Sequence, residues 1–165
     1  MLSECTMASP VGELTLVASG QGLRAVLWAE EREGRVPLPE RRSDPAHAIL
    51  AEAVRQLTDY FAGQRRAFDL PLDPVGTEFQ KSVWTGLGAI PYGETRSYAA
   101  LAAAIGRPGA SRAVGAANGR NPLSIVTPCH RVIGANGTLT GFAGGLAAKQ
   151  WLLAHERGER ALALA

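Results

Sequence analysis

The sequence predicts an α+β protein, in which a small N-terminal α/β lobe packs on a mainly helical C-terminal domain that carries a helix-turn-helix. Three observations predict it. Short apolar runs joined by glycine-containing turns open the chain, an amphipathic helix follows them, and two short helices separated by a turn lie in the second half. The 165 residues suffice for one domain, or for two small lobes that share a core. We expect the N-terminal lobe to span residues 1–75 and the C-terminal domain with the helix-turn-helix to span residues 76–165.

The first lobe is predicted element by element from its apolar pattern. Residues 14–18 and 23–28 are apolar and are joined by a turn with two glycines, which predicts a β-hairpin. Residues 30–45 are charged and contain three prolines, which indicates a loop. Apolar side chains then recur at helical spacing through 46–62, before a glycine stop. Alternation in 68–72 predicts another short strand.

The C-terminal domain begins with a helix start signal. Thr77 and Gln80 have the spacing of a capping box, and apolar side chains at helical spacing follow them. Ser97 is a candidate N-cap for a helix over 98–105. A Gly-Arg-Pro-Gly turn separates that helix from another over 110–119. Two short helices across such a turn are typical of a helix-turn-helix, although loose matches are common.

Composition excludes several classes of protein. The net charge is only +2, which argues against holding polyanions by bulk charge alone. Cys5 and Cys129 are the only cysteines, and with three scattered histidines they support neither a disulfide framework nor a zinc site, so we expect no metal. No basic leader and no apolar stretch of the ~20 residues needed to span a bilayer is present, so we expect a cytoplasmic protein without membrane contact. Charge is nevertheless uneven, because residues 94–131 hold five arginines against one acid, and this predicts a local basic face.

The segment Ile125-Val126-Thr127-Pro128-Cys129-His130-Arg131-Val132-Ile133 is the strongest candidate for chemistry. Pro128 restricts the backbone, so we expect the cysteine at a defined point where the chain leaves a buried strand. Neighbouring His or Arg charge lowers the pKa of a thiol, which favours a reactive Cys129 over a small buried hydrophobe. Successive strand residues point to opposite faces, so either the backbone turns at Cys129 or a water links it to His130.

The helix over 110–119 is almost bare of large side chains. Ala113, Gly115 and Ala116 leave its surface open, and Arg112 is the long cation on its first turn. Packing against another helix would explain the small residues, and close approach to a narrow groove explains them equally well. The pattern suits backbone contact and wedging into a base stack better than reading of base edges.

These motifs together resemble the O6-alkylguanine-DNA alkyltransferases. The resemblance runs from about residue 77 to 156 and rests on Pro128 to Val132, the Asn121-Pro122 pair, the helix of Arg112 and the later Gly-Phe-Ala-Gly-Gly-Leu run from Gly141. It implies DNA repair by direct reversal, in which the damaged guanine is flipped out of the duplex and its alkyl group passes irreversibly to the protein. The partner implied is double-stranded DNA with O6-alkylguanine, and possible further substrates include O4-alkylthymine. It implies no cofactor and no obligate protein partner, with cooperative assembly on DNA left open.

The resemblance also implies roles for single residues. Cys129 is the nucleophile and acceptor, His130 the general base through a water, and Glu156 the residue that orients it. Tyr98 displaces the phosphate and protonates the departing guanine, and Asn121 is a hinge. Without the resemblance, Glu156 would be read as an exposed carboxylate. The implied DNA-binding residues are Arg112, Tyr98, Ala113, Gly115, Ala116 and Asn118. The implied substrate-pocket residues are Pro128, Arg131, Val132, Leu139, Phe142, Ala143 and Gly144.

Departures from the family pattern and rival functions remain at this point. Ala143 and Phe142 stand where many members have serine and tyrosine, which puts tolerance of bulky adducts in doubt. A lesion-binding protein without catalysis, a transcriptional regulator and a Cys-His-Glu hydrolase are the alternatives. The presence of Cys129 argues against the first, and the bare helix and the adjacent Cys-His pair fit the others less well.

Overall fold

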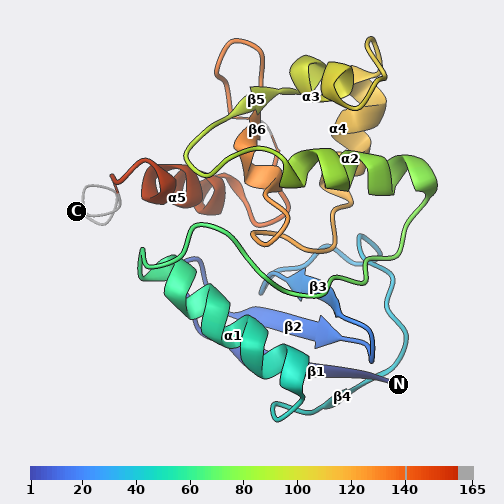
Figure 1. Ribbon diagram of the computed structural model, residues 1–165, viewed down its shortest axis with the longest axis vertical. Helices are drawn as coiled ribbons and strands as arrows, with labels where there is room; N and C mark the ends of the chain where they lie inside the picture. Colours follow the sequence, from blue (N-terminus) through green and yellow to red (C-terminus); the bar gives the residue numbers. More distant parts are fainter. Residues whose placement is uncertain (140, 160–165) are drawn as a thin grey trace.

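The computed structural model describes residues 1–139 and 141–159, and it has two halves stacked along its long axis (Figure 1). A sheet covered by one helix forms the lower half, and most of the other helices form the upper half. The α+β class predicted from the sequence is confirmed. Within the described residues, no helix has both the length and the apolar character needed to cross a membrane.

The lower half is a four-stranded sheet of order β3-β2-β1-β4. Strands β2 (Leu14–Ala18) and β3 (Leu23–Leu27) form the predicted antiparallel hairpin. Strand β1 (Leu2–Met7) pairs antiparallel with β2 and was not foreseen. Strand β4 (Arg41–Ser43) pairs parallel with β1 inside the predicted loop 30–45, so the prediction was wrong there. Its three residues are exposed, and they carry no apolar alternation that could have signalled a strand.

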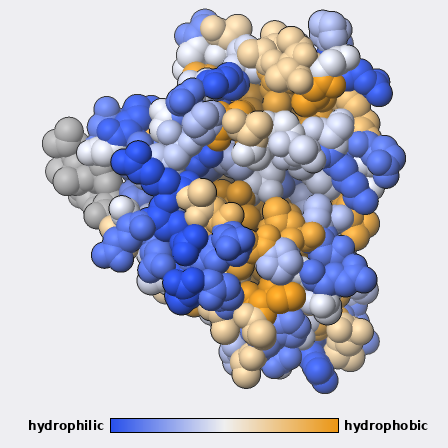
Figure 2. All heavy atoms as spheres, viewed as in Figure 1, coloured by the Kyte–Doolittle hydropathy of each residue, from blue (hydrophilic) through white to orange (hydrophobic). Residues whose placement is uncertain are grey.

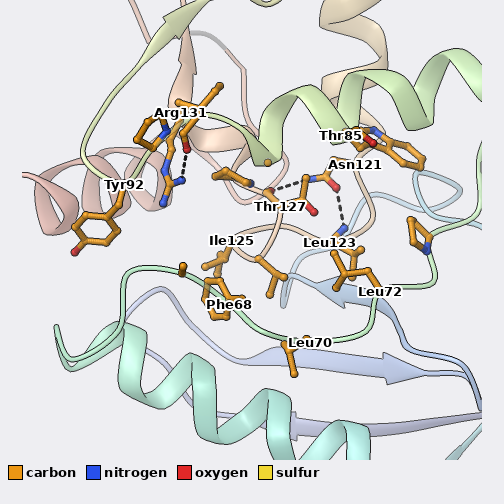
Figure 3. Close-up of a pocket in the computed structure, with 18 of the residues that line it drawn as sticks. Phe68, Leu70, Leu72, Thr85, Tyr92, Asn121, Leu123, Ile125, Thr127 and Arg131 are labelled. Atoms are coloured by element: carbon orange, nitrogen blue, oxygen red, sulfur yellow. Dashed lines mark hydrogen bonds between the residues drawn. The ribbon is translucent and has the colours of Figure 1, made fainter. Parts of the chain in front are cut away.

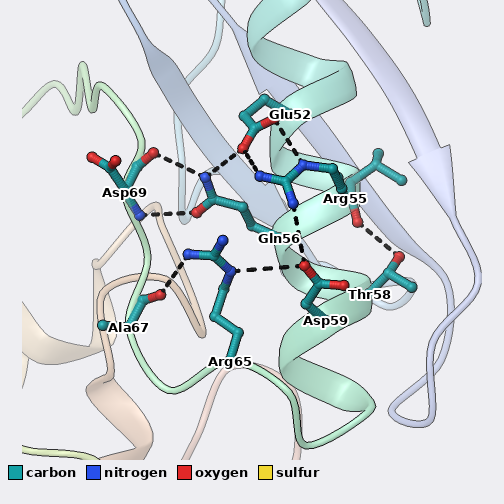
Figure 4. Close-up of polar contacts among 9 residues, drawn as sticks. Glu52, Arg55, Gln56, Thr58, Asp59, Arg65, Ala67 and Asp69 are labelled. Atoms are coloured by element: carbon teal, nitrogen blue, oxygen red, sulfur yellow. Dashed lines mark hydrogen bonds and ion pairs between the residues drawn. The ribbon is translucent and has the colours of Figure 1, made fainter.

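Helix α1 (Ala48–Phe61) packs on the sheet and confirms the predicted helix, with His47 accepting a bond from the Ile49 N–H at its start. The strand predicted over 68–72 is wrong, because this segment is an extended connection bound to α1. Figure 4 shows the Gln56 side chain joined to both main-chain groups of Asp69, each at 2.9 Å. The segment pairs with the sheet at one point only, an isolated parallel bridge between Leu72 and Leu23, in which Leu23 N–H donates to Pro71 O and Asp73 N–H to Leu23 O, both at 2.8 Å.

The upper half begins with helix α2 (Glu78–Gly88), whose capping box between Thr77 and Gln80 is present as predicted. Helix α3 (Tyr98–Ala104) starts at its predicted N-cap, where the Ser97 hydroxyl accepts from Ala100 N–H. Helix α4 (Ser111–Gly119) packs against α2 and α3. The two helices predicted on either side of a turn are therefore both confirmed.

The remaining elements carry the candidate chemistry. A 3₁₀ helix η1 (Cys129–Arg131) leads into the two-residue strand β6 (Val132–Ile133), which pairs parallel with β5 (Arg96–Ser97). Helix α5 (Leu146–Glu156) follows and lies beside η1. Two apolar clusters hold these parts. The larger one joins the sheet and α1 to Leu123, Ile125 and α5, and the other contains Cys129 among the side chains of α2, α3 and α4.

Candidate active site

The chain turns sharply at Cys129, as one of the two alternatives for this segment required. Residues 123–128 form a tight loop, with Thr127 N–H donating to Leu123 O and Cys129 N–H to Thr127 O, both at 2.8 Å. The cysteine then begins η1, and does not follow a regular strand as the sequence suggested. Its exposed fraction is 3%. A turn of 3₁₀ helix, unlike a strand, lets three consecutive side chains reach different partners.

Asn121 fixes this loop at both ends. Its Nδ2 donates to Thr127 O at 2.9 Å, and its Oδ1 accepts from Leu123 N–H at 3.0 Å (Figure 3). The residue is 1% exposed, so neither bond competes with water. Asn121 therefore sets the path of the backbone that presents Cys129, as a hinge residue is expected to do.

His130 and Glu156 meet in the interior. The Nε2–H of His130 donates to Glu156 Oε2 at 2.8 Å, and both side chains are almost wholly buried. The other ring nitrogen, Nδ1, is buried and has no hydrogen-bond partner among the described residues. A carboxylate accepts only, so this contact places the imidazole proton on Nε2 and leaves Nδ1 as a proton acceptor.

Burial and charge set the protonation of this pair. Burial lowers the pKa of His130, and the bond to Glu156 offsets only part of that effect. Burial would raise the pKa of Glu156, but the hydrogen bonds from His130 and Arg131 outweigh it and hold that pKa well below the usual range. The resting pair is therefore a neutral imidazole beside a carboxylate.

The thiol behaves differently from the prediction made on its neighbours. Burial raises the pKa of Cys129, although the Asn121 side chain and the Arg35 charge favour the thiolate. The prediction of a lowered pKa is wrong because Arg131 turns toward Glu156 and because His130 is neutral. A buried neutral thiol needs a base at the moment of reaction, which Nδ1 of His130 can supply.

Arg131, which the resemblance assigns to the substrate pocket, binds the carboxylate of this acid-base group. Its Nη1 donates to Ile90 O at 2.7 Å, and its other nitrogens bind Glu156. Arg131 also lines a cleft of about 530 Å³ between the two halves. Pro128, another predicted pocket residue, lines the same cleft. Figure 2 shows apolar side chains in this region between the halves, and Figure 3 shows Phe68, Leu70 and Leu72 on its lower side. Cys129 and His130 do not line this cleft.

The predicted DNA-binding residues of α4 divide between two faces. Arg112, Ala113 and Ala116 are exposed, whereas Gly115 is half-buried. A Cβ on Gly115 would lie 3.7 Å from the Tyr98 ring, which is ordinary van der Waals contact, so the packing of α4 on Tyr98 does not itself require glycine there. Asn118, the other residue of α4 predicted to bind DNA, is buried, and its Oδ1 has no hydrogen-bond partner among the described residues.

The basic face predicted over 94–131 is only partly present. Arg131 is buried, and Arg96 pairs with Glu94. Arg120 donates to the carbonyl of Gly34 in the other half. Arg112 and Arg107 are exposed, so the cationic surface here is smaller than the sequence suggested.

The predicted pocket loop is described except for Thr140. Phe142 packs edge-on against Trp28, with ring centroids 5.4 Å apart. Gly144 lies so close to the same indole that a Cβ would approach to 2.6 Å, which explains why glycine is needed there. Leu139 and Ala143 are half-buried, and Val132 is fully buried beside Cys129 in the apolar cluster.

Four residues of the site went unnoticed in the sequence. Lys149 is fully buried and donates to Val132 O at 2.7 Å. Ser124 accepts from the Trp28 indole, and Arg35 donates to the carbonyls of Gly119 and Asn121. Tyr60 reaches Glu156 from α1. Only Lys149 left a trace, as a lysine within an apolar helical stretch. Among the described residues, no cluster of three or more His, Cys, Asp or Glu side chains could hold a metal ion.

Comparison with known proteins adds to this geometry. Residues 3–74 match the "6-O-methylguanine DNA methyltransferase, ribonuclease-like domain", and residues 78–158 match the "6-O-methylguanine DNA methyltransferase, DNA binding domain". A methylated-DNA--protein-cysteine methyltransferase of Methanosarcina acetivorans is 51% identical over 145 residues, covering 88% of this chain and 92% of the relative. One from Mycolicibacterium paratuberculosis is 49% identical over 162 residues, covering 95% and 93%. The crystal structure of Mycobacterium tuberculosis OGT in complex with DNA superimposes with a TM-score of 0.89 at 47% identity, covering 98% of this chain and 97% of that one.

Proposed function

The chain belongs to the 6-O-methylguanine DNA methyltransferase family, and from that premise we propose that it transfers the alkyl group of O6-alkylguanine in DNA to its own Cys129. The protein repairs DNA by direct reversal, as a methylated-DNA--protein-cysteine methyltransferase. One observation supports the assignment of residues: the buried Cys129 lies at a fixed turn and is directly followed by His130, which is hydrogen-bonded to Glu156. We expect no cofactor, because the acceptor is a side chain.

The proposed reaction is one displacement. His130 Nδ1 takes the thiol proton through a bridging water, while the Nε2–H group keeps its hydrogen bond to Glu156. The sulfur attacks the alkyl carbon, so an S–C bond forms as the C–O6 bond breaks. The departing guanine takes a proton from the Tyr98 hydroxyl, which is later restored from the protonated relay. In sum, the alkyl group moves from O6 of the guanine to the sulfur of Cys129, and one proton moves from the thiol to the released guanine.

DNA is the partner, and the exposed side of α4 is the proposed contact. We propose that Arg112 fills the space left by a flipped base and that the small side chains of Ala113 and Ala116 let the helix enter a narrow groove, which their exposure supports. Binding of this kind is weakly dependent on sequence and weakened by salt. We propose Leu139, Phe142, Ala143 and Gly144 as the lip of the pocket that receives the guanine.

The acceptor is used once. A thioether has no good leaving group and lies outside the reversible oxidation ladder of cysteine, so no residue of the site regenerates the thiol. The protein is therefore a reagent consumed in equal amounts with its lesion, and we propose that it needs no obligate protein partner.

Mass spectrometry of the intact protein tests this function. The protein is mixed with a duplex that carries one O6-methylguanine, and Cys129→Ser serves as the control. We expect a gain of one methyl per molecule, located on the Cys129 peptide and absent from the variant. Tight lesion binding without a mass change would instead indicate a damage sensor, and neither binding nor transfer would contradict the proposal altogether.

A further inference from the structure

Tyr60 connects the N-terminal half of the molecule to the acid-base group. It lies near the end of α1, is fully buried, and donates its hydroxyl hydrogen to Glu156 Oε2 at 2.7 Å. The preceding residue of α5, His155, binds the main-chain oxygen of the same tyrosine through Nε2, also at 2.7 Å. Two consecutive residues of α5 thus hold both ends of Tyr60.

The hydroxyl acts on the oxygen that also holds His130. Oε2 of Glu156 receives Tyr60 at 2.7 Å, His130 at 2.8 Å and Arg131 Nη2 at 2.9 Å. Oε1 receives Arg131 Nε at 2.8 Å and Gly93 N–H at 3.3 Å. The two-point contact with Arg131 already fixes the plane of the carboxylate. The tyrosine is therefore not needed to orient it, and its hydroxyl instead draws negative charge from the oxygen facing the imidazole.

We propose that Tyr60 is a positioning residue of the transfer reaction, which limits the pull of Glu156 on the His130 proton and thereby keeps the imidazole ready to accept the thiol proton. This inference rests on the proposed function, since it concerns the same base. It also gives the N-terminal half a part in the chemistry, through a side chain 96 positions away from the carboxylate in the sequence.

The expected direction follows from the competition at Oε2. Without the hydroxyl, more of the carboxylate charge faces His130, so the protonated imidazole becomes more favourable. Protonated His130 cannot take the thiol proton. Transfer should then fail at a higher pH than in the wild type. The other ionisable groups packed around the pair are Arg131 on η1, Lys149 and His155 on α5, Cys129 on η1 and Tyr92 after α2.

A purely structural role predicts something else. The Tyr60 ring packs against Phe61, Phe68, Tyr92 and His155, with centroids between 5.1 and 6.2 Å apart. Tyr60→Phe keeps these ring contacts and removes only the hydroxyl, while Oε2 keeps two other donors. If Tyr60 only packed, the rate could fall but its pH dependence would not move.

The test is the single-turnover rate of methyl transfer against pH for the wild type and Tyr60→Phe. Leu50→Val, in the buried face of the same helix, is the control for loss of stability in α1. We expect the midpoint of the acid limb to rise by roughly 0.5 unit or more in Tyr60→Phe, and to stay in place in Leu50→Val. An unmoved midpoint in Tyr60→Phe overturns the inference. A wild type that transfers no methyl group contradicts the proposed function instead, so the two failures are distinguishable.

A second replacement covers the case in which Tyr60→Phe does not fold. 3-Fluorotyrosine at position 60 keeps the ring and makes the hydroxyl a stronger donor, so the midpoint should move to lower pH. The imidazole of His130 can be titrated by NMR in the DNA-free protein as a readout that does not require transfer. A titration that moves the same way for both replacements, or not at all, overturns the inference.

Discussion

Arg131 holds both carboxylate oxygens of Glu156, with Nε 2.8 Å from Oε1 and Nη2 2.9 Å from Oε2. It follows His130 on the same 3₁₀ turn, so two neighbouring side chains bind one carboxylate that arrives from α5. The cation of the Cys-His-Arg triplet therefore stabilises the carboxylate charge and its orientation, and it does not activate the thiol directly. Because Glu156 in turn binds His130, the buried Arg131–Glu156 ion pair is needed to keep the His130 base in place.

Replacing Arg131 should destabilise the fold strongly. Arg131→Met leaves Glu156 as a buried charge with less compensation, and breaking such a pair costs roughly 3–5 kcal/mol. Urea unfolding measures the loss. Arg55→Met is the matched control, because Arg55 binds Glu52 and Asp59 on the exposed side of α1 (Figure 4), where ion pairs contribute little. Equal effects of the two replacements would contradict this reading of Arg131.

Asn121→Ala should loosen the loop that carries Cys129. The change removes both side-chain bonds and leaves the buried Thr127 carbonyl and Leu123 N–H unpaired, which costs about 1–3 kcal/mol for each such group. It also removes the strongest interaction that favours the thiolate of Cys129. We expect slower methyl transfer together with a lower free energy of unfolding. Asn121→Asp keeps the acceptor for Leu123 N–H, so its transfer rate and free energy of unfolding should lie between those of the wild type and Asn121→Ala. A fully active Asn121→Ala protein would contradict the hinge role.

Local patterns made much of the fold predictable. The β2-β3 hairpin, α1 and the capping box of α2 depend on residues close in sequence, and all were recognised. Strand β4 could not be, because three exposed residues pair with β1 through main-chain atoms alone. The alternation in 68–72 was misleading because its apolar side chains line the interlobe cleft, while the backbone forms only one isolated bridge, between Leu72 and Leu23.

The acid-base group was only partly accessible to sequence reasoning. Cys129 and His130 are adjacent, but Tyr60 and Arg35 reach the site through tertiary contacts that leave no periodic signal. The sign of the Cys129 pKa shift also depends on burial, which a charge count of neighbours cannot supply. Where Glu156 lies in the fold decides its role, and a helical pattern alone does not reveal it.

Acid should destabilise the protein in two steps. The pKa of His130 is lowered in the folded state, so its contribution is complete above the unfolded value of about 6.5 and is lost as pH falls below it. The pKa of Glu156 is depressed, so its contribution is present above about 4.3 and is lost in more acidic solution. The free energy of unfolding, measured in urea from neutral pH downward, should decline less steeply between about pH 6.5 and 5 in His130→Asn. Identical slopes in the two proteins would contradict the burial of a neutral imidazole.

Arg112→Ala should separate DNA engagement from chemistry. Unstacking a base costs a few kcal/mol, so losing the side chain that fills the vacated space should slow transfer from duplex DNA roughly tenfold or more. Transfer from the free base O6-methylguanine needs no flipping and should be unchanged. Arg42→Ala, an exposed arginine on β4, controls for loss of one positive charge. Equal slowing with both substrates would place Arg112 in the chemistry and not in base flipping.

Alkylation should weaken the fold that surrounds the acceptor. Cys129 is 3% exposed and packs in the same cluster as Val132 and the side chains of α2 and α4. An added methyl group has to be accommodated in a packed interior, where overpacking typically costs about 1–3 kcal/mol. We expect the melting temperature to fall after stoichiometric reaction with O6-methylguanine DNA and removal of the DNA. Cys129→Ala, carried through the same treatment, should melt as before. A spent protein as stable as the unreacted one would mean that the site already holds room for the group it receives, and a larger adduct would then be needed to perturb it.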